Sequence, residues 1–226
     1  MQATMRWFSR WRDAVLLGLL TIGAYGVPLY TLGVLLTPIR ETEGWSLGAL
    51  AGAYAAGLLV AGGLAPLIGR ALDRMEPRNI LGPGLVLGST LIFAASYANA
   101  LPLFLGTWAL GAGVIGASMQ YNVTMPVTAR LYPAERRPAA YSALTLVGAI
   151  SSPIFFPLAG VLAGEWGWRA ALRVLTVLMI ACSVPAILIV RRRFDVEPPS
   201  RADHRAHQSI WQVLRSPVVF LTLGMV

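Results

Sequence analysis

The stretch GRALDRMEPR, residues 69–78, places five charged side chains in ten positions. The residues on either side carry no charge, from Gly44 to Gly69 before it and from Asn79 to Ala129 after it. An apolar stretch of about 20 residues is long enough to cross the hydrocarbon core of a bilayer as a helix. The pattern therefore predicts a charged connector between membrane-spanning segments, and the number of spans follows from the other uncharged stretches.

The composition excludes an ordinary soluble domain. Hydrophobic residues make up 56% and charged residues 12% of the 226 positions, whereas about a quarter of the residues in a soluble domain are charged. Five uncharged stretches of at least 17 residues run along the chain, at 14–39, 44–69, 79–129, 138–164 and 174–190. The chain is therefore predicted to lie largely within a membrane.

The longest of these stretches, residues 79–129, is too long for one span and fits two. We expect the break between them at YANALP, residues 97–102, where Asn99 and Pro102 favour a turn. The sequence thus predicts six transmembrane helices. Because the apolar stretches are continuous rather than alternating, an all-α integral membrane fold is favoured over a β-barrel.

The arginines predict how the helices are oriented. All 18 basic residues are Arg, and 15 of them fall in the N-terminal tail, the second and fourth connectors and the segment after the sixth helix. Basic residues are enriched in cytoplasmic loops. We therefore expect a multi-pass protein of the cytoplasmic (inner) membrane, with its N-terminus in the cytoplasm. This topology beside anionic lipid explains the net charge of +8, so we expect no nucleic-acid partner.

These patterns divide the chain into four regions. Residues 1–13 are predicted to form a cytoplasmic N-terminal tail, and residues 14–190 a six-helix transmembrane domain. Residues 191–216 are polar and contain prolines, which is typical of a linker. Residues 217–226 are mostly apolar but span only about half of a bilayer. We interpret them as the start of a truncated seventh helix and expect the chain to be a fragment of a longer protein.

The charged connector resembles the loop signature of the major facilitator superfamily, which runs roughly G-x-L-A-D-R-x-G-R-K between the second and third helices. Gly69, Asp73 and Arg74 match this signature in place, and Arg78 matches its terminal basic position. The resemblance covers about residues 25–190. It implies the N-terminal half of a twelve-helix fold, built from two inverted three-helix repeats. The partners that it implies are a small-molecule substrate, the lipid bilayer and a missing C-terminal half of six helices.

Three further stretches resemble the branch of monocarboxylate transporters and oxalate/formate antiporters. They are EGWSLGAL at 43–50, RLYPAERRPAAYSALTLVGA at 130–149 and GWRAAL at 167–172. The chain departs from this branch where Leu-Tyr-Pro at 131–133 replaces Trp-Phe-Pro and where Pro138 replaces a glycine. The resemblance implies that the transported solute is a small organic anion.

The superfamily resemblance also implies a gating role for Asp73, which we place about one turn beyond the end of the second helix. A carboxylate there can accept hydrogen bonds from arginines or from a helix N-terminus, and such contacts must break when the two halves of a transporter rock. We expect Arg130 to be its local partner. The predicted cytoplasmic gating motif consists of Gly69, Asp73, Arg74, Arg78 and Arg130. The alternative is that the arginines only set the topology and that Asp73 is solvated.

Glu76 and Pro77 replace the Gly-Arg pair of the family signature. Pro77 fixes its own φ and disfavours a helical backbone at Glu76. The carboxylate of Glu76 also adds a competing acceptor for the nearby arginines. We therefore expect a weaker gating contact than in relatives that carry the signature.

Polar side chains near glycines and prolines mark a candidate substrate cavity. In secondary transporters the solute binds near the bilayer midplane, where helices are interrupted at matching places of the repeats. The first and fourth helices have this character in GAYGVPLYTLG, residues 23–33, and GAGVIGASMQYNVTMP, residues 111–126. The candidate cavity residues are Tyr25, Tyr30, Tyr54, Gln120, Asn122, Ser151 and Ser152. The alternative is that these residues serve only helix packing and interfacial anchoring.

Charged and metal-binding residues are missing from the middle of the predicted helices. No Asp, Glu, Lys or Arg lies at mid-depth, where proton relays and ion pairs are found. The two histidines, His204 and His207, both lie in the predicted linker. We expect no enzyme activity, no cofactor and no metal site.

The function predicted from these patterns is secondary active transport of a small solute, an organic anion such as a monocarboxylate, by alternating access. Two alternatives stay open at this point. The chain is a non-transporting membrane protein or an inactive truncated relic, or it is an efflux carrier for hydrophobic drugs or metabolites.

Overall fold

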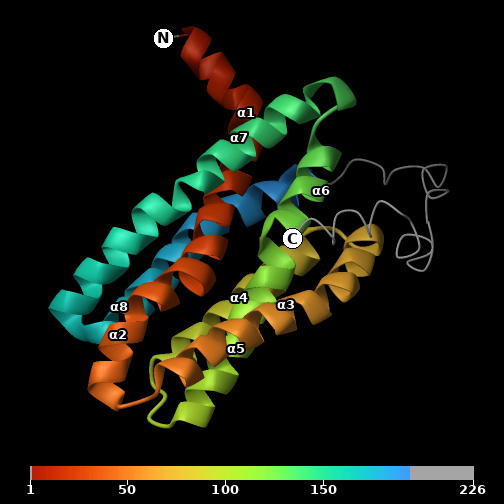
Figure 1. Cartoon of the computed structure of the whole chain (residues 1–226). Coiled ribbons are helices and arrows are strands. Elements are labelled where there is room, and N and C mark those ends of the chain that lie inside the picture. Colours follow the sequence, from red (N-terminus) through yellow and green to blue (C-terminus); the bar gives the residue numbers. More distant parts are fainter. Residues whose placement is uncertain (1, 194–226) are drawn as a thin grey trace, which may run out of the picture. The chain divides into compact units, whose positions relative to one another are not determined.

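The computed structural model describes the backbone of residues 2–193 and the side chains of residues 11–190 (Figure 1). This part of the chain consists of helices joined by short turns. Most of the predicted linker, from residue 194 on, and the predicted start of a seventh helix at 217–226 lie outside the described residues.

Five helical segments of the described chain are long and apolar enough to cross a membrane, as an all-α membrane fold requires. They are Trp11–Glu43, Leu47–Arg74, Arg78–Ala95, Leu101–Leu131 and Ala134–Val190. The last segment has 57 residues, more than twice the roughly 20 that one crossing needs. Its helix is interrupted at Gly167 by a backbone conformation (φ 76°, ψ 162°) that favours glycine.

The first span is built from three helical pieces. They are the α-helix α1 (Gln2–Tyr25), the π-helix η1 (Gly26–Thr31) and the α-helix α2 (Leu32–Glu43). Pro28 lies within η1, where its missing N–H interrupts the regular hydrogen bonding of a helix. The span ends at Gly44, whose left-handed backbone (φ 71°) lets its N–H donate to the carbonyl of Arg40.

The second and third spans are continuous helices. They are α3 (Leu47–Arg74) and α4 (Arg78–Ala95). The hydroxyl of Ser46 caps α3 by accepting a hydrogen bond from the N–H of Ala49. α3 extends beyond the predicted end at residue 69, so Asp73 lies in its last turn and not one turn beyond it. The extension is favourable because Leu72 is buried and because Arg74 complements the helix dipole at the C-terminus.

The remaining spans are interrupted helices. Their pieces are α5 (Leu101–Met119), α6 (Tyr121–Leu131), the 3-10 helix η2 (Ala134–Arg136), α7 (Arg137–Ala149) and α8 (Ser151–Arg193). The turn between α4 and α5 falls where the sequence predicts it. Pro102 lies in the first turn of α5, where its missing N–H has no intrahelical partner to lose.

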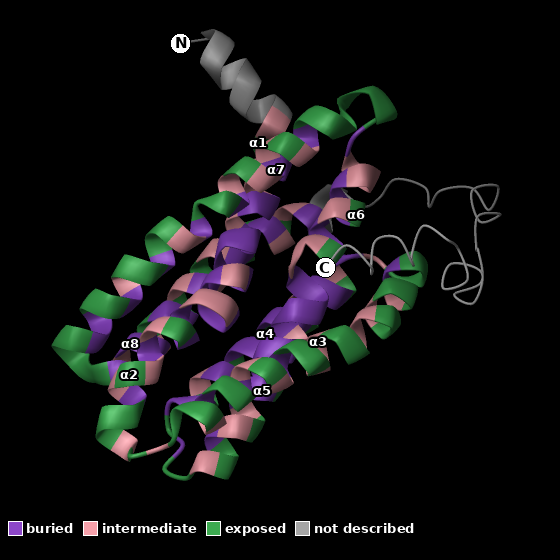
Figure 2. Cartoon of the chain, in the orientation of Figure 1, coloured by how far each residue is buried: buried purple, intermediate pink, exposed green. Residues whose placement is uncertain are grey.

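The helices pack in two groups that contact each other. α5 lies against both α3 and α4, α1 lies against both α7 and α8, and α4 also contacts α8. Figure 2 shows buried residues concentrated along α4 and α5, whereas α3 presents an exposed face. Gly113 of α5 permits a close approach of α3, because a Cβ there would collide with Val60. Leu59 of α3 is 77% exposed, as expected for a side chain outside the packed interior of a membrane protein.

Candidate functional site

Regular helical hydrogen bonding is interrupted at three places that lie close together. These are η1 in the first span, Gln120 between α5 and α6, and Ile150 between α7 and α8. Gln120 and Ser151, which follows the third interruption, both donate hydrogen bonds to carbonyls of α1 shortly before η1. In a membrane, backbone groups freed by an interruption must find partners within the protein, and irregular helical turns are frequent at functional sites.

Gln120 joins the first and fourth spans. Its backbone is extended (φ −85°, ψ −171°), and no side chain caps the N-terminus of α6 that follows it. Its side-chain Nε2 donates to the carbonyl of Ala24 at 3.1 Å. Asn122, an exposed residue in the first turn of α6, donates to the carbonyl of Ala117 at 2.7 Å. The interruption is therefore stabilised by the two side-chain amides on either side of it.

A small cleft opens beside this interruption, between η1, α3 and α5. Its wall is formed by Pro28, Leu29, Tyr54, Gly57, Leu58, Ala61, Ala112, Gly116 and Gln120. The structure thus brings two of the predicted cavity residues, Tyr54 and Gln120, into one wall. Both side chains can exchange hydrogen bonds with a ligand, while the rest of the wall is apolar.

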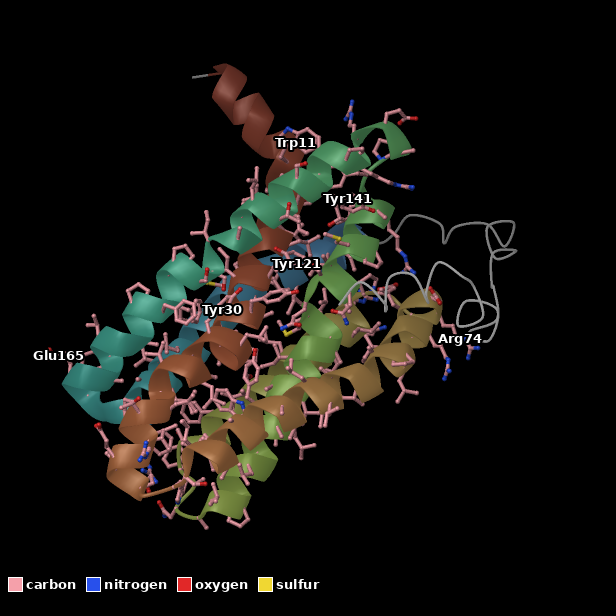
Figure 3. The ribbon with its side chains drawn as sticks, in the orientation of Figure 1. Trp11, Tyr30, Arg74, Tyr121, Tyr141 and Glu165 are labelled. Atoms are coloured by element: carbon pink, nitrogen blue, oxygen red, sulfur yellow. The ribbon has the colours of Figure 1, made fainter. Side chains whose placement is uncertain are left out.

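The other predicted tyrosines lie near the interruptions but do not line this cleft. Tyr25 of α1 packs against Tyr121 of α6 with ring centroids 5.1 Å apart. Tyr30 of η1 packs against Phe156 of α8 at 5.2 Å (Tyr30 and Tyr121 are labelled in Figure 3). All four aromatic rings therefore join helices that are distant in sequence.

The two predicted serines lie at the start of α8. Ser151 is buried, and its hydroxyl donates to the carbonyl of Ile22 at 2.7 Å. This contact fits the packing role that we considered as the alternative for Ser151. Ser152 is half-buried beside it and does not line the cleft.

Two residues of the predicted gating motif come together at the end of α3. Nη2 of Arg130 donates to the carbonyl of Leu72 at 2.7 Å and lies 4.0 Å from Oδ1 of Asp73. The arginine thus satisfies one of the last carbonyls of α3 and lies near the carboxylate at the same time. The carboxylate of Asp73 is more than half exposed, so water weakens this ion pair.

The other members of the motif do not join this contact. Arg78 pairs with Glu76 of the turn. Arg74 lies at the end of α3, next to the turn, and is exposed (Figure 3). Gly69 is also exposed, and no atom of the described residues lies within 4 Å of the place where a Cβ would be.

Comparison with known proteins identifies the family of this chain. Residues 5–226, nearly the whole chain, match the family model described as Major Facilitator Superfamily. The chain belongs to the major facilitator superfamily. No curated protein matches the chain significantly. Membership establishes a multi-pass membrane protein with a role in transmembrane transport, and it supports the prediction that the chain is not an enzyme.

This member of the superfamily has a second charged contact, before the start of α3, that the sequence did not predict. We call it the Arg169 cluster and define it as Glu43, Ala98, Asn99, Trp168 and Arg169. Nη1 of Arg169 binds the carboxylate of Glu43, and Nη2 donates to the carbonyl of Ala98 at 2.7 Å and to Oδ1 of Asn99 at 3.2 Å. One guanidinium therefore joins the end of α2, the turn between α4 and α5, and α8.

Aromatic rings surround the Arg169 cluster. The guanidinium lies 4.4 Å from the centre of the Trp168 ring, and Nε1 of Trp168 donates to Glu43 at 3.3 Å. Trp168 is buried and packs edge-on against Phe104, with ring centroids 5.8 Å apart. Trp45 packs against the same phenylalanine at 5.3 Å. The stretch EGWS, residues 43–46, contains Glu43 and Trp45, and the stretch GWR, residues 167–169, contains Trp168 and Arg169. These two stretches are the local sequence pattern from which the cluster could have been predicted.

Among the described residues, no group of three or more His, Cys, Asp and Glu side chains is arranged to hold a metal ion. The chemistry that the cleft offers is therefore hydrogen bonding from Tyr54 and Gln120 together with apolar contact.

Proposed function

We propose that this chain is the N-terminal six-helix half of a secondary transporter that carries a small organic anion, such as a monocarboxylate, by alternating access. The observation that carries the proposal is the hydrogen bond from Gln120, at the interruption of the fourth span, to Ala24, just before the interruption of the first. Secondary transporters bind their solutes where interrupted helices of two repeats meet. The cleft that contains Tyr54 opens at this place.

The interruption at Gly167 supports six spans rather than five. A residue with φ 76° and ψ 162° does not continue a helix. The parts of the last segment before and after it, residues 137–166 and 168–190, are each long enough to cross a bilayer. On this interpretation the fifth and sixth spans meet in a tight turn at Gly167.

The packing of the six proposed spans supports two inverted three-helix repeats. The first span packs on the fifth and sixth, just as the fourth packs on the second and third, and the third packs on the sixth. If spans one, two and three are relabelled as spans four, five and six and the reverse, the same pairs of spans are in contact. The irregular segments at η1 and at Gln120 then occupy corresponding spans of the two repeats.

The exposed face of α3 supports a further partner, a second unit of six helices. Large apolar side chains on this helix are exposed, among them Leu58, Leu59 and Leu67. We propose that this second unit covers part of this face and that Asp73 contacts it during part of the transport cycle. The excess of arginine near the ends of α3 and α6 supports a cytoplasmic location for this end in the inner membrane.

The polar groups near the cleft support an anionic substrate. Tyr54 and Gln120 supply hydrogen-bond donors in the cleft wall. The N-terminus of α6 begins directly after Gln120 without a side-chain cap, and the positive end of a helix dipole favours negative charge. A carboxylate bound beside Gln120 would be stabilised by both.

The proposal is tested by uptake of radiolabelled monocarboxylates into liposomes that contain the complete protein. The change Gln120→Leu should lower kcat/KM about tenfold or more, because it removes a donor while keeping the size of the side chain. Tyr54→Phe, which removes only a hydroxyl, should have a smaller effect in the same direction. Thr107→Ala is the matched control, because this half-buried residue does not line the cleft and its hydroxyl bonds within its own helix.

Two outcomes would overturn the proposal. If no monocarboxylate is taken up or competes, while a hydrophobic dye is expelled, the protein is an efflux carrier. If uptake occurs but Gln120→Leu leaves it unchanged in protein of normal thermal stability, the solute does not bind at this cleft.

A further inference from the structure

The Arg169 cluster joins parts of the chain that are far apart in sequence. Glu43 precedes Arg169 by 126 residues, and Ala98 precedes it by 71. Glu43 ends the first span, and Ala98 and Asn99 form the turn between α4 and α5. Arg169 follows the interruption at Gly167. The ends of three different parts of the bundle are therefore connected through one side chain.

The geometry of arginine is required for these contacts. A guanidinium has several N–H donors in a fixed plane, and here Nη1 binds Glu43 while Nη2 binds the Ala98 carbonyl and the Asn99 side chain. The ammonium group of a lysine is a point charge that cannot reproduce this fork. Trp168 contacts both charged partners, because its ring lies under the guanidinium and its N–H donates to Glu43.

The surroundings of the cluster strengthen the ion pair. The side chains of Glu43 and Arg169 are 17% and 29% exposed, and Trp168 packs against both Trp45 and Phe104. Restricted access of water strengthens an ion pair when hydrogen bonds satisfy the remaining donors and acceptors. The ion pair at Glu43 meets this condition through the additional bonds from Trp168 and to the turn at 98–99.

We propose that the Arg169 cluster is a cooperative joint: it couples the end of the first span, the turn at 96–100 and the part of α8 that begins after Gly167, so that these three segments open only together. The π-helix η1 gives the joint a consequence for the candidate site. Since a π-helix separates α2 from α1, contacts at Glu43 hold α2, and with it the wall residues Pro28 and Leu29, in place against the other spans.

The test is hydrogen–deuterium exchange of the full chain in detergent micelles, followed in peptides that cover residues 40–46, 96–100 and 166–170. Glu43→Gln keeps the size of the side chain but removes its charge. It should speed exchange about tenfold in all three segments, because a charge-assisted hydrogen bond that closes the joint is lost. Glu41→Gln is the control, since Glu41 lies on the same helix end and is exposed; it should leave all three segments unchanged.

If Glu43→Gln fails to fold, a second variant still tests the proposal. Arg169→Lys retains a positive charge near Glu43 but loses the bonds to Ala98 and Asn99, so exchange should rise in all three segments and not in 96–100 alone. The proposal is overturned if Glu43→Gln speeds exchange in 40–46 alone, or if Arg169→Lys leaves 96–100 as protected as in the unaltered protein. Neither readout requires a transported solute, so the result is independent of the proposed function.

Discussion

Two arginines, one lying before the start of α3 and one at its end, make contacts of different strength. Before its start, Arg169 binds Glu43 and the turn at 98–99 inside a wall of aromatic rings. Near its end, Arg130 binds the Leu72 carbonyl and lies 4.0 Å from an aspartate whose side chain is 55% exposed. Water and salt screen the second pair much more than the first. The end of α2 is therefore firmly connected to its neighbours, while the charge pair at the end of α3 separates easily.

This difference matches the demands that the proposed alternating-access mechanism makes on the proposed six-helix half. Contacts within the half have to survive each cycle, whereas contacts at a gate have to form and break. If the ion pair between Asp73 and Arg130 were strong, Asp73 would not readily exchange Arg130 for another partner at the gate. The exposed carboxylate of Asp73 remains available for a partner outside the described residues, whereas the half-buried carboxylate of Glu43 is already bound to Arg169.

The largest effect is expected from Arg169→Ala. The change leaves Glu43 without its guanidinium in a setting from which water is largely excluded, and should lower the free energy of unfolding by about 2–3 kcal/mol. Thermal unfolding in detergent should show a midpoint several degrees lower. Arg173→Ala, which removes a cation–π contact with the exposed Tyr97, should cost less than about 1 kcal/mol. Equal effects of the two changes would show that the Arg169 cluster has no special role in stability.

An intermediate effect is expected from Arg130→Ala. The variant loses the charge-assisted hydrogen bond to the carbonyl of Leu72, and its unfolding free energy should fall by about 1–2 kcal/mol. Arg74→Ala, at an exposed position of the same helix end, should stay within about 0.5 kcal/mol of the unaltered protein. The comparison between the two ends would fail if Arg130→Ala were as destabilising as Arg169→Ala.

The smallest effect on stability is expected from Asp73→Asn. The ion pair is long and exposed, so its loss should change the free energy of unfolding by less than about 0.5 kcal/mol, and high salt should remove even that difference. The transport rate should nevertheless change, because the gating role proposed for Asp73 depends on its charge. Uptake into liposomes measures this directly, and an unaltered rate would refute the gating role.

The membrane fold and the positions of its turns could be predicted because they depend on local properties of the sequence. Uncharged stretches and the turn residues at 97–102 are visible without any knowledge of contacts. The end of α3 was predicted five residues too early, since charge was taken to end the helix. Charged residues continue a helix readily when one face, here with Leu72, still packs on its neighbours.

The candidate site could be predicted only in part, because its geometry depends on long-range contacts. Gln120 and Tyr54 were predicted as cavity residues from polarity and depth, and both line the cleft. The bond from Gln120 to Ala24 connects residues 96 positions apart, and no local pattern indicates it. The same limit applies to Glu43 and Arg169, which individually look like ordinary charged residues at helix ends.

The order of the residues in the Arg169 cluster has a consequence for biosynthesis. Glu43 enters the membrane region early in synthesis, and its guanidinium partner is made 126 residues later, a delay on the order of ten seconds at usual translation rates. The joint therefore closes only after the chain has turned at Gly167 and the part of α8 that follows Gly167 has begun to leave the ribosome. A nascent chain that stalls before this point carries Glu43 at the end of α2 without its guanidinium partner, which distinguishes an incomplete helical bundle from a finished one.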